Sequence, residues 1–197
     1  MRRPSFFPTL TTARLELRAP VGGDAGELFA IFSDPEVMRY WSTPPMVGLA
    51  QAEALVDETG NHFLAGTGLR WAVCRPDDGR VIGTASLFHF DFQNSRAEIG
   101  YALGRGSWGQ GFMNEALVAV IGFAFGEMDL RRLEADADPR NAASIRTLER
   151  LGFVREGLLR ERWVVAGVVS DSAIFGLLRR GWEARQGARE SRVKPRD

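Results

Sequence analysis

The sequence predicts a mixed α/β fold built on a twisted, mostly antiparallel central sheet that is flanked by helices. Two observations lead to this prediction. Three consecutive segments with the character of strands are joined by short turns, and a further pair of strands closes the chain as a hairpin. Strands and helices do not alternate regularly, so the order does not favour a parallel sheet.

The first third of the chain is expected to hold one strand and two helices. Apolar and charged residues alternate over 14–19, which predicts a strand. Asp24 and Glu27 have the spacing of a capping box, and the apolar residues that follow predict a short helix. Asp34-Pro35 indicates a loop. Apolar residues with helical spacing then predict a helix over 48–64.

The middle of the chain is predicted to form a meander of strands over 70–74, 81–90 and 94–103. The segment Asp77-Asp78-Gly79-Arg80 has the composition of a tight hairpin turn between the first two strands. Gly83 lies inside the second strand and indicates a bulge there.

The second half is expected to begin with a helix over 112–128, which is apolar on most faces and should therefore be buried. A strand over 132–137, a helix over 142–151 and a hairpin of strands over 153–165 and 168–178 complete the predicted elements.

Length and composition indicate one ordinary globular domain. Of 197 residues, 45% are apolar and 25% charged, and we expect a single domain over 1–182 followed by a flexible, charged tail over 183–197. The formal net charge is zero, which argues against nucleic acid and anionic membranes as partners. No secretory signal and no apolar run of about 20 residues is found, so a cytoplasmic location is expected.

Metal and disulfide chemistry are not expected. Cys74 is the only cysteine, so no internal disulfide can form. The two histidines, His62 and His89, are isolated and lack a third ligand at metal-site spacing.

The most informative segment is 98–116, EIGYALGRGSWGQGFMNEA. It places an apolar strand before a glycine-rich turn and a helix start. Backbone N–H groups at a helix start have no partner within the helix, and the helix dipole adds positive charge there. Glycines allow close approach of an anion because they carry no Cβ. We therefore predict a phosphorylated ligand at Gly109 to Asn114.

Gly104, Gly106 and Gly109 also satisfy the fingerprint of a dinucleotide-binding fold. That fold would begin with a strand–helix–strand unit and place an acidic residue at a strand end about 20 residues later. Here three strands of a meander come first, and Glu127 and Asp129 still lie at the end of the long helix. A nucleotide-binding oxidoreductase is therefore the least favoured interpretation.

A set of motifs in fixed order supports another interpretation. These motifs are EIGY at 98–101, WGQGFMNEA at 108–116, PRNAAS at 139–144, LGF at 151–153 and EGLLR at 156–160. Together they resemble the GNAT superfamily of acyl-CoA N-acyltransferases, and in particular its ribosomal-protein alanine N-acetyltransferase branch. The resemblance covers roughly residues 14–178, and it implies the GNAT fold and acetyl-CoA as the acyl donor.

The resemblance also implies roles for individual residues. Backbone N–H groups of the glycine turn would bind the pyrophosphate, the strand before it would pair with pantetheine, and Asn141 would hydrogen-bond the same arm. The positions that the resemblance assigns to acetyl-CoA are Tyr101, Ala102, Leu103, Trp108, Gly109, Gln110, Gly111, Phe112, Met113, Asn114, Asn141 and Ser144.

For catalysis, Glu98 resembles the carboxylate that accepts a proton from the amine, directly or through water. Many relatives carry an acidic tyrosine seven residues after the asparagine, where this chain has Leu148, so Ser144 is the substitute proton donor. The expected reaction is direct transfer to a primary amine, such as a protein N-terminus. Two alternatives stay open: a small-molecule amine (an antibiotic, polyamine or amino acid), and a non-catalytic acyl-CoA-binding module. The expected assembly is a monomer or homodimer.

Overall fold

The structure is a computed structural model that describes residues 1–193. Within them, eight strands form one sheet in the order β1-β2-β3-β4-β5-β6-β8-β7. Neighbouring strands are antiparallel except β5 and β6, which are parallel. The predicted mixed α/β fold with a mostly antiparallel sheet is confirmed. The strands are β1 Leu10–Thr11, β2 Glu16–Arg18, β3 Gly68–Cys74, β4 Val81–Asp91, β5 Arg96–Leu103, β6 Arg132–Ala137, β7 Val154–Val165 and β8 Val168–Leu178.

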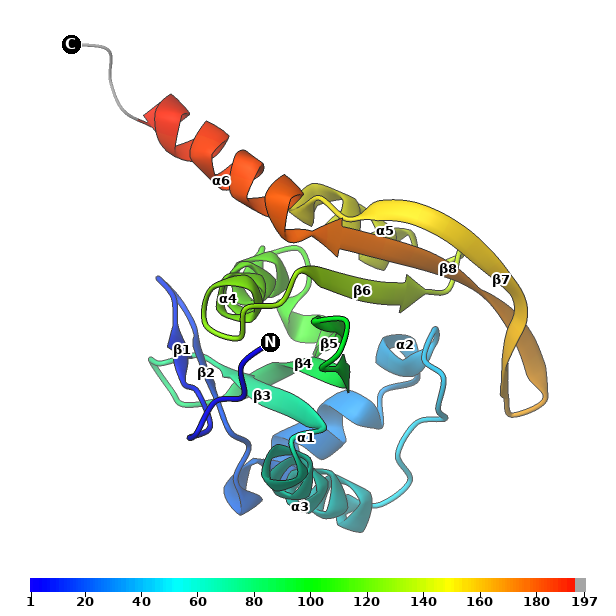
Figure 1. The fold of residues 1–197 in the computed structure, drawn as a ribbon. Helices are drawn as coiled ribbons and strands as arrows, with labels where there is room; N and C mark the ends of the chain where they lie inside the picture. Colours follow the sequence, from blue (N-terminus) through cyan, green and yellow to red (C-terminus); the bar gives the residue numbers. More distant parts are fainter. Residues whose placement is uncertain (194–197) are drawn as a thin grey trace.

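Helices cover both faces of the sheet (Figure 1). Buried residues of α1 and α2, together with one from α3, pack against one face of β3 to β5, and α4 and α5 pack against the other face. On β3, for example, Trp71 faces the α4 side whereas Ala72 faces the α1 side. The α-helices are α1 Ala25–Phe32, α2 Pro35–Met38, α3 Leu49–Ala65, α4 Phe112–Gly126, α5 Ala142–Leu151 and α6 Arg179–Val193.

The larger core surrounds α4, the helix expected to be buried. Nine of its residues are buried, and Leu117 and Ile121 are fully so. They pack with Trp71 of β3 and Phe175 of β8, which are also fully buried. Replacing such a side chain with Ala typically costs about 2–5 kcal/mol, so this core holds the two halves of the sheet together.

Two local predictions near the N-terminus are wrong. Asp24 does not form a capping box with Glu27, because its carboxylate turns back to Arg18 (2.7 and 2.8 Å) and to the N–H of Val21 (2.8 Å). Asp34-Pro35 does not mark a loop but begins α2, since the Asp34 carboxylate caps the helix and proline is tolerated at its first position.

The bulge indicated by Gly83 is confirmed. Val73 pairs with Gly83 and Cys74 pairs with Val81, so one extra residue is inserted in β4. A Cβ at Gly83 would lie 2.4 Å from the carbonyl oxygen of Ala102, so only glycine fits this close approach of β4 to β5.

The sheet splays between β5 and β6. Their pairing is confined to residues 96–98 of β5 and 132–134 of β6. Beyond Glu98 the two strands separate, β5 continuing with β4 and β6 with β8. The second half of β5, residues 99–103, therefore has one free edge, as the fold implied by the motifs requires.

The C-terminal part contains a long hairpin and a helix. Strands β7 and β8 form a long curved hairpin whose far end bends down past the level of α2 (Figure 1). Residues 183–193, assigned by sequence to the charged tail, continue α6, which Trp182 anchors in the core with 6% of its surface exposed. The remaining tail residues, 194–197, lie outside the described part of the chain.

Candidate active site

The glycine turn presents a run of backbone donors. Gly109 and Gly111 have φ angles of 74° and 80°, which favour glycine, and α4 begins at Phe112. Among the described residues, no acceptor is found for the N–H groups of residues 109–114, and the first bonded N–H in α4 is that of Glu115, to the Gly111 carbonyl at 3.1 Å. Six consecutive donors at a helix N-terminus suit an anion such as a phosphate.

Trp108, which the resemblance also assigned to acetyl-CoA, does not contribute its backbone N–H to this run. The N–H of Trp108 already donates to the Arg105 carbonyl at 3.2 Å, within a short 3-10 turn over Arg105–Ser107. The indole N–H of Trp108 donates to the Leu103 carbonyl at 2.6 Å. Trp108 therefore ties the turn to the end of β5 and leaves the donors from Gly109 onward exposed.

A second contact holds the turn from the other side. Arg14 donates to the Gln110 carbonyl at 3.1 Å and pairs with Glu115 at 2.7 Å, while Glu115 also accepts from Thr12 at 2.6 Å. Burial pushes the pKa of Glu115 up, but the hydrogen bonds from Thr12 and Arg14 outweigh it, so its pKa is lowered and it stays ionised. Neither Arg14 nor Thr12 was a candidate from sequence.

The free edge of β5 supplies further backbone groups. The N–H of Gly104 bonds to the Ile82 carbonyl at 2.8 Å, which fixes the alternation of the ladder with β4. By that alternation, the backbone groups of Ala102 point to β4 and those of Tyr101 point to the open edge. A strand-like ligand arm can therefore pair with Tyr101, whereas the Leu103 carbonyl is already taken by Trp108.

Asn141 begins α5 and also faces the cleft. Its side-chain oxygen accepts from the N–H of Ser144 at 3.1 Å, which caps the helix. This bond leaves the Asn141 side-chain NH2 as the group directed to a ligand, and among the described residues it has no acceptor. The position that the motif assigned to pantetheine thus keeps a free donor.

Ser144 forms a side-chain contact with Tyr101. Their hydroxyl oxygens are 2.8 Å apart, and both residues line the cleft. Burial raises the pKa of Tyr101 to about 12, although the hydrogen bond with Ser144 opposes the shift. Tyr101 therefore keeps its proton at neutral pH, and the pair places two hydroxyl groups at the edge of β5. Leu148, where many relatives carry tyrosine, is in the core with 1% exposure.

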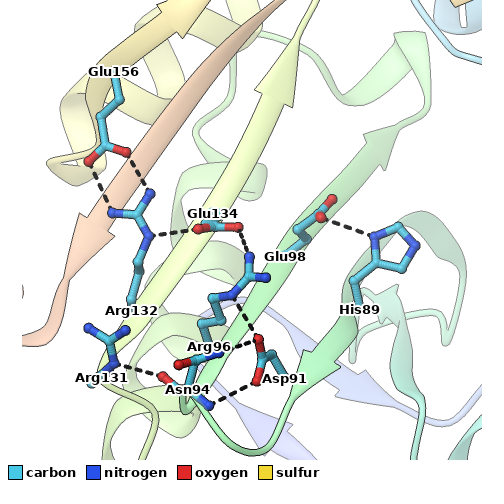
Figure 2. Close-up of polar contacts among 9 residues, drawn as sticks. All are labelled: His89, Asp91, Asn94, Arg96, Glu98, Arg131, Arg132, Glu134 and Glu156. Atoms are coloured by element: carbon cyan, nitrogen blue, oxygen red, sulfur yellow. Dashed lines mark hydrogen bonds and ion pairs between the residues drawn. The ribbon is translucent and has the colours of Figure 1, made fainter.

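Glu98 is the last residue of β5 that pairs with β6. Its carboxylate is 3.0 Å from Nδ1 of His89, which lines the cleft from an outward-bulging stretch of β4 with φ 49° (Figure 2). Sequence reasoning treated Glu98 and His89 separately; the missing signal was the bulge, which brings His89 over the strand to Glu98.

Ion pairs hold the sheet together at the point where it begins to splay (Figure 2). Arg96 of β5 bonds to Asp91 at 3.2 Å and to Glu134 of β6 at 2.6 Å. Arg132 of β6 then bonds to Glu134 at 2.8 Å and to Glu156 of β7. These contacts tie β5, β6 and β7 beside Glu98, so the position of that carboxylate is set by the strands on both sides of it.

A cleft of about 740 Å³ lies beside the free edge. It brings together Tyr101, Asn141 and Ser144 with His89, and aromatic side chains line much of the rest. The aromatic lining residues outside β5 and the C-terminal hairpin are Phe32, Tyr40, Trp41, Phe88, Phe90 and Phe92. A cleft of this size, with aromatic walls and many polar and charged groups, suits a small polar organic ligand or a short chain segment.

The residues present fit coenzyme A. The donor run suits its pyrophosphate, the free edge of β5 suits its amide-bearing arm, and the cleft lies beside that edge. This fold and site define the class of acyl-CoA-dependent N-acyltransferases.

Comparison with known proteins identifies the family. Residues 14–154 match the model of the acetyltransferase (GNAT) domain, so the chain belongs to this family and is an N-acetyltransferase. The resemblance read from the motifs is confirmed. The chain is 39% identical over 172 residues to the Bacillus licheniformis protein called "Uncharacterized N-acetyltransferase p20", covering 87% of this chain and 97% of that protein.

Two further comparisons concern one enzyme named for its substrate and one structure solved with ligands. The [ribosomal protein uS5]-alanine N-acetyltransferase of Escherichia coli is 29% identical over 118 residues, covering 59% of this chain and 61% of that enzyme. The structure of spermidine N-acetyltransferase from Vibrio cholerae, in complex with CoA and spermine, matches with a TM-score of 0.77 at 22% identity, covering 87% of this chain and 99% of that one.

In the described residues, no helix is both long and apolar enough to cross a membrane.

Proposed function

We propose that this N-acetyltransferase moves an acetyl group from acetyl-CoA directly to a primary amine held in the cleft. The observation that carries the proposal is the alignment of three features: the donor run at Gly109–Asn114, the free edge at Tyr101 and the side-chain amide of Asn141. Together they follow the path of one extended ligand from its phosphates to its reactive end. Acetyl-CoA supplies the activated acyl group as a thioester.

The base in this proposal is Glu98. A primary amine is mostly protonated at neutral pH and must lose a proton before it can attack. Glu98 accepts that proton, and His89, at 3.0 Å, stands between the carboxylate and the cleft. The proton reaches Glu98 either through His89 or through a water beside it, because Glu98 does not itself line the cleft.

The acid is the Tyr101–Ser144 pair. When the new C–N bond forms and the C–S bond breaks, the sulfur leaves with the bonding electron pair and needs a proton. The hydroxyl pair, with oxygens 2.8 Å apart at the free edge, donates it. Ser144, helped by water, was the donor inferred from sequence; its contact with Tyr101 makes the pair the better candidate. No covalent bond between the protein and the acetyl group is required.

The acceptor class is open between two candidates. The relative that acetylates an alanine of a ribosomal protein supports a protein N-terminus. The relative solved with spermine supports a small-molecule amine. The cleft accommodates either, since it is open to solvent at one side and lined by aromatic side chains.

Two measurements test the proposal together. Isothermal titration with acetyl-CoA is expected to show saturable binding to one site, and a thiol reagent is expected to detect free CoA when an amine is added. Binding without thiol release, for any amine in a broad panel, would indicate the non-catalytic acyl-CoA module. Absence of acetyl-CoA binding would refute the proposed site.

A further inference from the structure

The charged side chains of the cleft differ in whether they have partners. Asp138 is paired with Arg140 through bonds of 2.6–3.2 Å, and His89 is paired with Glu98. His62 is 2.8 Å from the hydroxyl of Thr67. Arg70 of β3 lines the same cleft, yet no hydrogen bond or ion pair joins its side chain to any described residue. It is the exception among the arginine, aspartate and histidine side chains that line the described part of the cleft.

Arg70 is also poorly solvated. Its Nη1 atom is buried without a partner, and the side chain as a whole is half-buried. Burial lowers the pKa of Arg70, and Glu58 of α3 opposes this only by longer-range attraction, without an ion pair. Since arginine stays protonated in proteins, the cleft contains a cation whose charge no neighbouring group neutralises.

The position of Arg70 relates it to the reaction. Arg70, Ser86 and Gly100 are register partners across β3, β4 and β5, so they share one row on the same face of the sheet. The row ends at Gly100 on the free edge of β5, whereas the Tyr101 side chain, in register with Ala85 and Trp71, lies on the opposite face. Neighbouring strands lie about 4.8 Å apart, so the backbone of Arg70 is about 10 Å from that edge. Ser86 and Gly100, which follow Arg70 in this row, are small residues, so they leave space in this part of the cleft.

The opposite side of the cleft carries a carboxylate with complementary properties. Asp136 of β6 accepts hydrogen bonds from two neutral groups, the Trp163 indole at 3.2 Å and the Ser172 hydroxyl at 2.8 Å. These donors orient the carboxylate without cancelling its charge. The same cleft is thus lined by a cation on β3 and an anion on β6, neither of which forms an ion pair with a described residue.

Resting on the proposed function, we propose that the acceptor is a zwitterion: an amine that also carries a carboxylate, which pairs with Arg70. Its ammonium end lies toward Asp136 and the edge of β5 before deprotonation. The aromatic walls formed by Trp41 and Phe88, among others, suit an apolar side chain on the same molecule. An α-amino acid with an apolar or aromatic side chain has all three parts. A polyamine would instead place a second positive charge against the buried guanidinium.

A binding experiment tests this without relying on turnover. The protein saturated with CoA is titrated with N-acetyl-L-phenylalanine, a product of the proposed class, and with its neutral amide. The acid is expected to bind roughly ten- to a hundredfold more tightly, because hydrogen bonds between charged groups discriminate by about that factor. Equal affinity for acid and amide, or no binding of the acid at millimolar concentration, would overturn the proposal.

Variants assign the effect to Arg70. Arg70→Met is expected to abolish the preference for the acid while leaving CoA affinity and melting temperature within error. Arg150→Met, which removes an exposed arginine on α5, and Glu58→Gln are expected to keep the preference. A preference that survives in Arg70→Met would place the carboxylate elsewhere and refute the assignment.

A turnover panel separates this inference from the proposed function. It compares L-phenylalanine, L-phenylalaninamide, phenethylamine, spermidine and a short peptide with a free N-terminus. Thiol release that is fastest with the amino acid supports the proposal that the acceptor is a zwitterion. Release that is faster with spermidine or the peptide overturns that proposal but leaves the proposed acetyltransferase activity unaffected. Selective binding of the acid without release by any amine refutes only the direct-transfer proposal.

Discussion

At the residue scale, two close side-chain pairs lie where the proposed reaction needs proton transfer. Glu98 and His89 stand on the side of the incoming amine, and Tyr101 and Ser144 stand at the free edge of β5. Neither pair is visible as a unit in the sequence, because its members are separated by 9 and 43 residues. Each pair forms only once the β4 bulge and the start of α5 are in place.

Glu98→Gln tests the base. The amide cannot accept the proton, so turnover is expected to fall by about a hundredfold or more and to lose its dependence on pH. Acetyl-CoA affinity should not change. Steady-state rates from pH 6 to 9 check this, with Glu149→Gln on the exposed side of α5 as the control. An unchanged rate for Glu98→Gln across this range would mean that another group takes the proton.

Asn141 combines two roles that substitution can separate. Asn141→Ala removes both the helix cap and the free amide, so it is expected to lose about 1 kcal/mol of stability and to weaken acetyl-CoA binding. Asn141→Asp keeps the capping oxygen but removes the side-chain donors, so only the affinity should fall. Melting curves and titrations of both variants check this. If Asn141→Asp bound acetyl-CoA with wild-type affinity, the Asn141 side chain would not contribute to the binding site.

What could be predicted at this scale depended on the motif. The glycine turn and Asn141 stood out because their residue types and spacing are distinctive. Arg70 did not, because an arginine in a strand usually has its charge in water or in an ion pair. Its distinguishing property is the absence of a partner, and that follows from how α3 and β3 pack. No sequence pattern carries that information.

At the element scale, the turn before α4 is the feature on which the site depends most. It is held by the Trp108 indole, which bonds to the Leu103 carbonyl, and by Arg14, which bonds to the Gln110 carbonyl, while among the described residues the N–H groups from Gly109 to Asn114 have no acceptor. The positive φ angles at Gly109 and Gly111 make this arrangement accessible to glycine.

Gly111→Ala should disturb the turn. A side chain at φ 80° is strained by about 1–2 kcal/mol, so the loop is expected to rearrange and acetyl-CoA affinity to fall about tenfold. Gly122→Ala, at an exposed helical position with open space for a Cβ, is the control. It should slightly raise stability and leave affinity unchanged. Titration of both variants decides, and equal affinity would show that the turn does not bind the phosphates.

The sequence predicted the elements correctly where a segment was long enough to show a clear pattern of apolar residues. The buried helix α4 and the meander of β3, β4 and β5 follow from runs of apolar residues. Shorter elements escaped: β1 has two residues and α2 has four, too few to show a period. The helix α6 also escaped, because it is mostly charged and its packing depends on Trp182 alone among the buried residues described there.

At the scale of the whole molecule, many carboxylates are paired with arginines. Hydrogen bonds from Arg140 lower the pKa of Asp138. Burial raises the pKa of Asp24, but hydrogen bonds from Arg18 and Val21 outweigh it, and the net pKa is lowered. Glu156 has its pKa lowered by Arg132. The stability that these ion pairs give to the cleft, the first helix and the sheet therefore depends on the ionisation of acidic groups.

The pH dependence of stability follows from these directions. A carboxylate whose pKa is lower in the folded state stabilises the fold fully above its unfolded pKa, about 4 for Asp and Glu, and loses this contribution as pH falls. The melting temperature is therefore expected to be level from pH 6 to 8 and to decline below about pH 5. Arg140→Met should flatten part of the decline. Thermal unfolding as a function of pH checks this, and stability that rises toward pH 4 would contradict it.

The direct measurement of the central claim is amide NMR of the 15N-labelled, 197-residue protein during a titration with CoA. The account predicts that the amide signals of Gly109–Asn114 and of Tyr101 shift together and that their hydrogen exchange slows as CoA saturates. If CoA binds while these amides keep their positions and exchange rates, the donor run does not hold the pyrophosphate, and the assignment of the site is wrong.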